Sequence, residues 1–277
     1  MSSTAAAAAA ASTTPAASAE DIAKHGWTAV PLDADAIFGD KPFLHEPAPV
    51  LVDDIPFPSD DPLVAKVQEY VRRELPEPTF NHSMRVYNFG YIILKHQFQE
   101  HFESISLSTW ALTALLHDIG TARRNLTSTL LSFEFWGGFH ALDLLSSSSS
   151  LLRKESGVGG VDVDVAAAPK PQAEAVAEAI IRHQDLGTEG TISLLGQVVQ
   201  LATVYDNMGL RPGLVHTRTR DAVIGKWPRL GWSSCFEGVI REEMGLKPWA
   251  HTSHSGEAFP KGVKENGETG LMSEYEK

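Results

Sequence analysis

Four side chains in this sequence have the types and the order of a metal site. His82 is followed by the adjacent pair His117 and Asp118 and then, much later, by Asp206. Two imidazoles and two carboxylates suit a divalent ion such as Zn, Fe or Mn, and the single cysteine rules out a closed cysteine-rich site. We therefore predict that these four residues hold a divalent ion, and that the ion keeps one position open for water, as in catalytic sites.

The predicted helices place these ligands on buried faces. In the helix expected over residues 79–99, His82 is followed by Val86, Phe89 and Ile93 at steps of four, three and four residues, so it faces the core with them. For His82 taken alone, the alternative is a core histidine that donates to a backbone carbonyl. The complete set of four is what favours a metal site over a purely structural core.

Both carboxylates stand where apolar helices stop. Asp118 comes at the end of an apolar run that Gly120 closes, and Asp206 ends the apolar stripe of a helix expected over residues 191–207. An unpaired carboxylate buried in such a position costs several kcal/mol, so it is ionised only when a counter-charge or a metal accompanies it. The helix that ends near Asp118 and the helix that ends near Asp206 therefore share one arrangement, an apolar face that stops at a carboxylate.

The rest of the chain predicts a helical domain. Residues 26–62 are rich in proline and aspartate, which forbids a long helix, and we interpret them as an irregular arm laid over the domain. Further helices are expected over residues 62–75, 108–118, 128–145, 172–183, 217–226 and 233–245. No segment alternates with a period of two, so the predicted fold class is all-α, with about eight helices in one domain.

Changes in composition mark the limits of this domain. Residues 1–25 are rich in alanine and serine, without a strongly apolar segment, which predicts a disordered leader and no secretory signal. Residues 146–171 combine a serine run with glycines and prolines, which predicts a flexible insertion. We expect the domain to span residues 26–250 with that insertion inside it, and a polar C-terminal tail over residues 251–277 that frays.

Composition also limits the function classes. The chain has 277 residues, 43% of them hydrophobic, and a formal net charge of -12. No basic run is long enough to follow a phosphate backbone, which argues against nucleic acid, and no apolar run approaches the ~18 residues that span a membrane. A lone Cys235 suits a reducing compartment and simple packing. We expect a soluble, cytoplasmic homo-oligomer that takes a small neutral substrate.

The order His82, His117–Asp118 and Asp206 resembles the signature of the HD superfamily of metal-dependent hydrolases. The likeness narrows to the fungal cyanamide hydratases over about residues 26–250, and the insertion over residues 146–171 departs from their pattern. The segments that carry it are Gly26-Trp-Thr-Ala-Val-Pro31, Asn81-His-Ser-Met-Arg85, Leu131-Ser-Phe-Glu-Phe135, Ile181-Arg-His-Gln-Asp185, Leu201-Ala-Thr-Val-Tyr-Asp-Asn207 and Gly231-Trp-Ser-Ser-Cys-Phe236.

The resemblance implies an HD-type helical domain that uses zinc to add water to cyanamide, a small nitrile, and so forms urea. The nitrile carbon needs a nucleophile at neutral pH, and a zinc-activated water with a pKa near 7 provides it. His183 is the first candidate for the proton donor or shuttle, because histidine titrates in this range. Glu134 is the second, either orienting the attacking water or fixing a metal-bound imidazole. A structural pairing of Glu134 with Arg85 or Arg123 is equally open.

Thr203 and Asn207 are the candidates for binding the substrate amine, although the Thr203 hydroxyl could instead bond back to its own helix. A nucleotide phosphohydrolase is the alternative enzyme, and it would need cations to bind phosphate. The candidates for that role are Arg85, Arg123, Arg124 and Arg182. A non-catalytic ligand-sensing module is a third alternative, and the complete set of four ligands argues against it.

Overall fold

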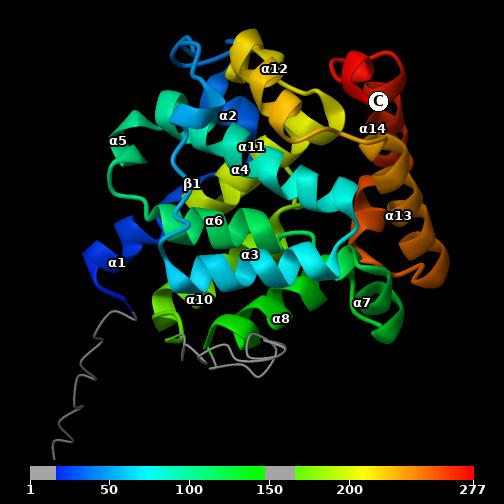
Figure 1. The fold of residues 1–277 in the computed structure, drawn as a ribbon, viewed down its shortest axis with the longest axis horizontal. Coiled ribbons are helices and arrows are strands. Elements are labelled where there is room, and N and C mark those ends of the chain that lie inside the picture. Colours follow the sequence, from blue (N-terminus) through cyan, green and yellow to red (C-terminus); the bar gives the residue numbers. More distant parts are fainter. Residues whose placement is uncertain (1–16, 147–165) are drawn as a thin grey trace, which may run out of the picture.

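The computed structural model describes residues 17–146 and 166–277, and helices make up most of both stretches (Figure 1). This confirms the predicted all-α class. A short antiparallel sheet joins β1 (Ala29–Pro31) to β2 (Thr191–Ser193), with Ala29 opposite Ser193. This pairing attaches the N-terminal arm to the start of a central helix.

The helices form a bundle, with 3-10 helices, labelled η, in several connections (Figure 1). The first half of the chain contains α1 (Ala19–Lys24), α2 (Ala34–Phe38), η1 (Val52–Asp54), α3 (Pro62–Glu74), α4 (Glu77–Gln97), α5 (Gln99–Phe102), α6 (Leu107–Leu116), η2 (Ile119–Thr121), α7 (Arg123–Ser128) and α8 (Phe133–Ser146). The second half contains α10 (Lys170–Arg182), α11 (Leu194–Met208), η3 (Pro212–Leu214), α12 (Thr217–Lys226), α13 (Trp232–Leu246), η4 (His251–Ser255), α14 (Ala258–Glu268) and η5 (Ser273–Tyr275).

Helix α4 runs through the middle of the bundle and carries the first predicted ligand. It contacts α3, α6, α11, α12 and α13. A proline occupies its first turn, where the missing backbone N–H would have had no partner in the helix. His82, Val86, Phe89 and Ile93 are each fully buried, which confirms the predicted core-facing stripe.

The pair His117–Asp118 lies between α6 and η2. The Ser106 hydroxyl accepts a hydrogen bond from the Thr109 N–H and caps the start of α6. Beyond the pair, the turn passes against the start of α8, so that a Cβ on Gly120 would lie 2.1 Å from the Phe133 carbonyl oxygen. Glycine is required at this position because any side chain would push the pair away from α8.

Helix α11 carries the fourth predicted ligand. The Ser193 hydroxyl accepts from the Gly196 N–H at its start, and Gly209, with φ +65°, ends it in the left-handed conformation. The predicted stripe is confirmed, since every member is at most 2% exposed: Leu195, Val199, Ala202 and Asp206.

The helix predicted over residues 128–145 is wrong in its first part, because two helices, α7 and α8, occupy this region. Between α7 and α8, backbone carbonyl groups accept hydrogen bonds from side chains in the C-terminal part of the molecule. The Leu130 carbonyl accepts from the Trp249 indole, and the Leu131 carbonyl accepts from the Lys247 ammonium group. These distant partners replace the helical hydrogen bonds that the local pattern predicts.

The structure also corrects the expectation of a polar, fraying tail over residues 251–277. Helix α14 packs Phe259 and Val263 against Trp232 and Phe236 of α13, and all four side chains are at most 4% exposed. Only two apolar residues four positions apart carry this contact, which is too short a pattern to stand out in a polar sequence.

The predicted leader over residues 1–25 and the predicted insertion over residues 146–171 fall largely outside the described residues. Within the described part, α1 occupies residues 19–24 of the leader, and α10 already begins at Lys170. The domain limits at residues 26–250 stay a prediction.

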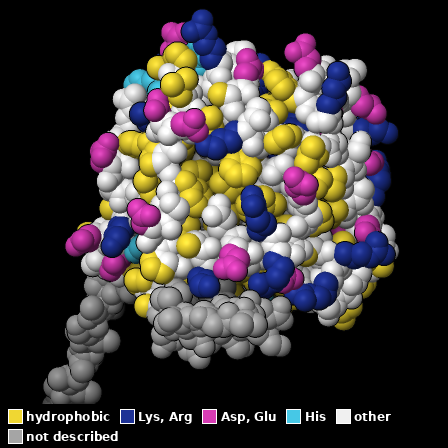
Figure 2. Space-filling view, in the orientation of Figure 1, with side chains coloured by type: hydrophobic (Ala, Val, Ile, Leu, Met, Phe, Trp, Pro, Cys, Tyr) yellow, Lys and Arg dark blue, Asp and Glu magenta, His cyan; other side chains and the backbone are white. Residues whose placement is uncertain are grey.

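One face of the molecule carries acidic and basic side chains interspersed among apolar and uncharged atoms (Figure 2). No continuous basic stripe crosses this face. Among residues 17–146 and 166–277, no helix combines the length and the apolar character needed to cross a membrane.

Candidate metal centre

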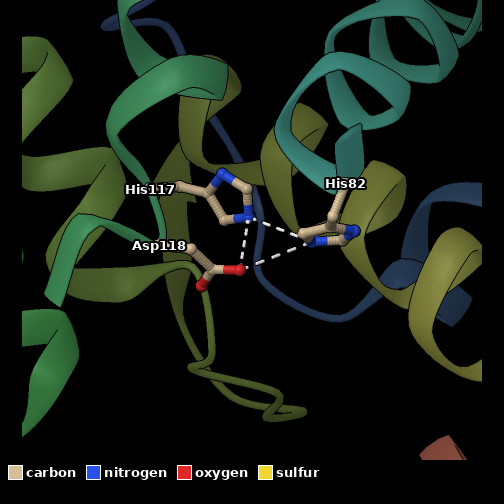
Figure 3. Close-up of side chains that lie close together, drawn as sticks. All are labelled: His82, His117 and Asp118. Atoms are coloured by element: carbon tan, nitrogen blue, oxygen red, sulfur yellow. Dashed lines mark hydrogen bonds and ion pairs between the residues drawn. The ribbon is translucent and has the colours of Figure 1, made fainter. Parts of the chain in front are cut away.

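Three of the four predicted ligands converge inside the bundle (Figure 3). The Nε2 atoms of His82 and His117 lie 3.2 Å apart, and Asp118 Oδ2 lies 3.3 Å from the second and 3.6 Å from the first. All three side chains are at most 1% exposed. Within the described ranges, no other group of three histidine, cysteine or acidic side chains is close enough to share an ion.

The hydrogen bonds of the two imidazoles leave a lone pair on each converging nitrogen. His117 Nδ1 lies 2.8 Å from the Ala114 carbonyl oxygen, which can only accept, so Nδ1 carries the proton. His82 Nδ1 lies 2.6 Å from Asp206 Oδ2, and the same reasoning applies. In their neutral tautomers, both rings therefore point lone pairs at one another and at a carboxylate. Such an arrangement needs a metal ion, or a proton on His117 Nε2, between them.

Asp118 fits an ion in the same way. Both of its oxygens are buried, and neither accepts a hydrogen bond from any described residue, which is costly for a carboxylate unless a cation is present. Zinc bonds of ~2.0–2.1 Å in a tetrahedral arrangement separate neighbouring ligand atoms by roughly 3.3–3.4 Å. The three separations, 3.2, 3.3 and 3.6 Å, match that spacing. The residues present therefore fit a small divalent ion with three protein ligands and an open position.

Burial and charge put His82 and Asp118 in the forms that bind metals. Burial lowers the pKa of His82 to about 4, against the opposing effect of Asp206, so the imidazole is neutral at pH 7. Burial acts to raise the pKa of Asp118, but His117, His82 and His183 together hold that pKa below its usual range. His82 and Asp118 therefore need to lose no proton before they bind an ion. Burial acts to lower the pKa of His117, but Asp118 and the Ala114 carbonyl raise it overall, so an ion would take the place of a proton on His117 Nε2.

Asp206 lies behind His82 and not within the group of three. Its Oδ2 meets His82 Nδ1, the nitrogen that points away from His117. Arg85 donates to both carboxylate oxygens at 2.9–3.1 Å, and Arg229 donates to Oδ1 at 2.7 Å. Burial acts to raise the pKa of Asp206, and these two arginines lower it overall. In this arrangement Asp206 orients His82, and direct ligation by Asp206 stays a prediction.

His183, the predicted proton donor or shuttle, lies beside the group. Its Nε2 is 3.9 Å from Asp118 Oδ1, and its ring meets the His117 ring edge-on with the centroids 5.4 Å apart. Its Nδ1 lies 2.7 Å from the Ile180 carbonyl oxygen, so in the neutral ring Nε2 carries no proton. Burial, reinforced by the charge of His117, lowers the pKa of His183. At neutral pH His183 is thus a proton acceptor.

Glu134, the second catalytic candidate, is fully buried in the first turn of α8. Its Oε1 accepts from the Thr252 hydroxyl at 2.8 Å and lies 3.5 Å from His251 Nδ1. Glu134 is therefore paired with Thr252 and His251, and not with Arg85 or Arg123 as in the alternative of a purely structural ion pair. Its Oε2 is buried and accepts no hydrogen bond from the described residues, and its charge acts to raise the pKa of His183. Glu134 is therefore an electrostatic neighbour of His183.

The two candidates for substrate binding are buried on α11 but already have partners. The Thr203 hydroxyl donates to the Gln200 carbonyl oxygen at 2.9 Å, which is the backbone-bonded alternative. The Asn207 Oδ1 accepts from the Trp232 indole N–H at 2.7 Å. Roles for Thr203 and Asn207 in substrate binding stay predictions.

Two residues against the site were missed by the sequence reasoning. Trp232 stacks on the His82 ring with centroids 4.2 Å apart and an interplanar angle of 14°. Trp232 lies in the segment 231–236, which resembles the cyanamide hydratases, and this resemblance was the one indication in the sequence that Trp232 belongs to the site. Arg229, which pairs with Asp206, lies between α12 and α13, where no helical pattern exists to reveal it.

A helical bundle with a histidine, a His-Asp pair and a distant aspartate around its centre is the arrangement of an HD domain. The HD-domain family matches residues 79–208, which include His82, His117, Asp118 and Asp206. The chain belongs to this family. Membership supports a metal-dependent enzyme, and the candidate ligands for a divalent ion are the three residues that converge.

The relatives extend the similarity beyond the HD domain. Two proteins of Saccharomyces cerevisiae, cyanamide hydratase DDI2 and cyanamide hydratase DDI3, are each 35% identical to this chain over 242 residues. The aligned region covers 87% of this chain and 96% of each yeast protein. An alignment of this length extends well beyond residues 79–208, the part of the chain that the HD-domain family matches.

Proposed function

We propose that this protein adds water to cyanamide and forms urea. The observation that carries the proposal is the convergence of His82, His117 and Asp118 in a chain that aligns with two yeast cyanamide hydratases over almost their whole length. Two imidazoles and a carboxylate are a common ligand set of catalytic zinc. Zinc is the metal we propose, with Fe or Mn as alternatives.

His82, His117 and Asp118 would hold the ion through the atoms that converge. When bound, the ion supplies a water whose pKa falls to about 7, and so a nucleophile at neutral pH. His183 Nε2 takes a proton from the attacking water and returns it to the nitrile nitrogen as the C–O bond forms. The product of this addition is an imidic acid, which becomes urea when a proton moves from oxygen to nitrogen.

Glu134 supports this proton shuttle. His183 must become positively charged for part of the cycle, and burial opposes that charge. Asp118, the Ile180 carbonyl and, to a smaller extent, the buried Glu134 carboxylate act to raise the pKa of His183 against burial, which lowers it overall. Glu134 thus adds to the effect of Asp118 in helping His183 to accept a proton, while burial helps His183 to release it.

The phosphohydrolase alternative is disfavoured by the partners of its four candidate arginines. Each already pairs with a carboxylate of the chain: Arg85 with Asp206, Arg123 with Glu242, Arg124 with Glu74 and Arg182 with Asp185. A phosphate would have to replace these carboxylates, whereas a neutral nitrile needs no cation besides the metal.

The test is urea formation from cyanamide, with metal content measured on the same sample and phosphate release measured on a panel of nucleotides. Phosphate release without urea would refute the proposal. Absence of both activities and of bound metal, even after zinc is added, would favour the sensing module.

Variants then separate the roles. We expect H117A to lose both metal and activity, and H183A to keep the metal and lose rate. H45A is the matched control, because His45 is an exposed histidine of the N-terminal arm. An H183A enzyme with the full rate would remove His183 from the mechanism.

A further inference from the structure

Four charged or titratable side chains form an unbroken series of contacts that ends at the candidate metal centre. The Glu276 carboxylate accepts from Arg229 Nε at 2.6 Å, and Arg229 Nη1 donates to Asp206 Oδ1 at 2.7 Å. Asp206 Oδ2 in turn meets His82 Nδ1 at 2.6 Å. The side chain of Glu276 is 18% exposed, and the other three are fully buried. The series thus leads from the surface to a candidate metal ligand.

The charges in this series balance only when Glu276 is included. Asp206 is flanked by two fully buried arginines, Arg85 and Arg229, which leaves one positive charge without a negative partner. Glu276 supplies that partner. A buried charge that lacks its counter-charge is strongly destabilising, so Arg229 depends on this carboxylate to keep its position.

Glu276 is itself held firmly in place. The Ser233 hydroxyl and the Ser233 N–H donate to its two carboxylate oxygens at 2.8 and 3.3 Å. The Gly231 N–H donates to its backbone carbonyl at 2.9 Å. The same Ser233 hydroxyl accepts from Arg229 Nη2, so one serine fixes both members of the ion pair.

We propose that Glu276 is a positioning residue for the metal centre, which acts through Arg229 and Asp206 to set the orientation of His82 and the strength of its hydrogen bond to Asp206. The proposal rests on the metal site of the proposed function but not on its substrate. Without Glu276, Arg229 has only Asp206 as an anionic partner and draws more strongly on that carboxylate. Asp206 then accepts less well from His82 Nδ1–H, and His82 becomes a weaker ligand.

The C-terminal helices are also docked by contacts that do not involve Glu276. The Asn266 side-chain amide donates to the carbonyl oxygens of Asp206 and Asn207, and its oxygen accepts from the Met272 N–H. The Met272 side chain is fully buried. Removing the charge of Glu276 therefore leaves this segment in place, and its effect on the metal can be read separately from unfolding.

The experiment compares E276Q with E274Q. Glu274 lies two residues away in η5 and is exposed, so E274Q removes the same charge from the same region without touching Arg229. Zinc affinity is measured by competition with a chromophoric chelator, and folding by circular dichroism. We expect E276Q to bind zinc about tenfold more weakly than wild type, at the lower end of what is typical for residues that support a metal ligand. E274Q should match wild type.

The cobalt-substituted proteins give a second readout, because the visible bands of Co(II) report the geometry of its ligands. These bands should shift in E276Q and not in E274Q. E276D keeps the charge, and its zinc affinity should lie between those of E276Q and wild type. If E276Q binds zinc within twofold of E274Q with unchanged cobalt bands, or if E276D is as weak as E276Q, the proposal is overturned.

Failure of this proposal can be told from failure of the proposed function. Weaker zinc binding by E276Q in a protein that makes no urea would uphold the positioning role and refute the substrate. Urea formation by wild type together with equal zinc affinities for E276Q and E274Q would uphold the proposed function and refute the positioning role of Glu276.

Discussion

Replacing Asp206 with asparagine should strongly destabilise the protein, although the substitution exchanges only one carboxylate oxygen for an NH2 group. The carboxylate is fully buried and accepts from Arg85, Arg229 and His82. Asparagine is similar in shape but leaves two buried guanidinium groups facing a neutral side chain. Breaking a buried pair in this way costs about 3–5 kcal/mol. For a domain of this size, that corresponds to a fall in Tm of roughly 6–20 °C.

The assay is thermal and urea unfolding of metal-free protein, so that loss of metal does not contribute. D53N is the matched control, because Asp53 pairs with Lys226 at 2.7 Å but is 84% exposed. An exposed pair contributes less than about 1 kcal/mol. A D206N variant that loses no more stability than D53N would refute the reasoning.

The pH dependence gives this prediction a second arm. The folded state lowers the pKa of Asp206, chiefly through Arg85 and Arg229 acting against burial. A group with a lowered folded pKa stabilises the protein above its unfolded pKa, here near 4, and loses that contribution as the pH falls further. The stability difference between wild type and D206N should therefore be constant above about pH 5 and shrink below pH 4.

Two further predictions concern the surroundings of the site. The hydrogen bond with Asp185 raises the pKa of His251 to about 9, so this contact should stabilise the fold fully below about pH 6.5 and lose its effect as the pH rises through 9. Urea unfolding of wild type and H251Q at pH 6 and pH 10 should show a difference only at the lower pH. A Cβ on Gly120 would meet the Phe133 carbonyl at 2.1 Å, so G120A should cost about 1–3 kcal/mol and weaken zinc binding. G225A is its control, since nothing lies within 4 Å of a Cβ on Gly225, and equal melting of both variants would contradict the prediction.

The parts of the site that local periodicity places were predictable from the sequence. His82 and Asp206 share faces with apolar residues of their own helices, and both faces are buried as expected. Arg229 and Glu276 were not predictable, because they contact Asp206 and one another across separations of 23 and 47 residues. The first lies outside any helix, so no pattern indicates what it faces. Sequence reasoning therefore found the candidate ligands and missed the charges that hold one of them.

The three histidines at the centre show how helix ends can prepare a site for an ion. His117 and His183 each occupy the C-terminal cap of a helix, and each Nδ1 lies within hydrogen-bond distance of the carbonyl three residues earlier, Ala114 and Ile180. Such carbonyls lack the N–H four residues on that a continuing helix would supply, so this contact helps to satisfy the helix end and fixes the tautomer. His82 lies within a helix, where no carbonyl is free to accept from its Nδ1, and Asp206 is the acceptor instead. The anionic acceptor orients His82 toward the ion, while the neutral carbonyl leaves Nε2 of His183 as a proton acceptor beside it.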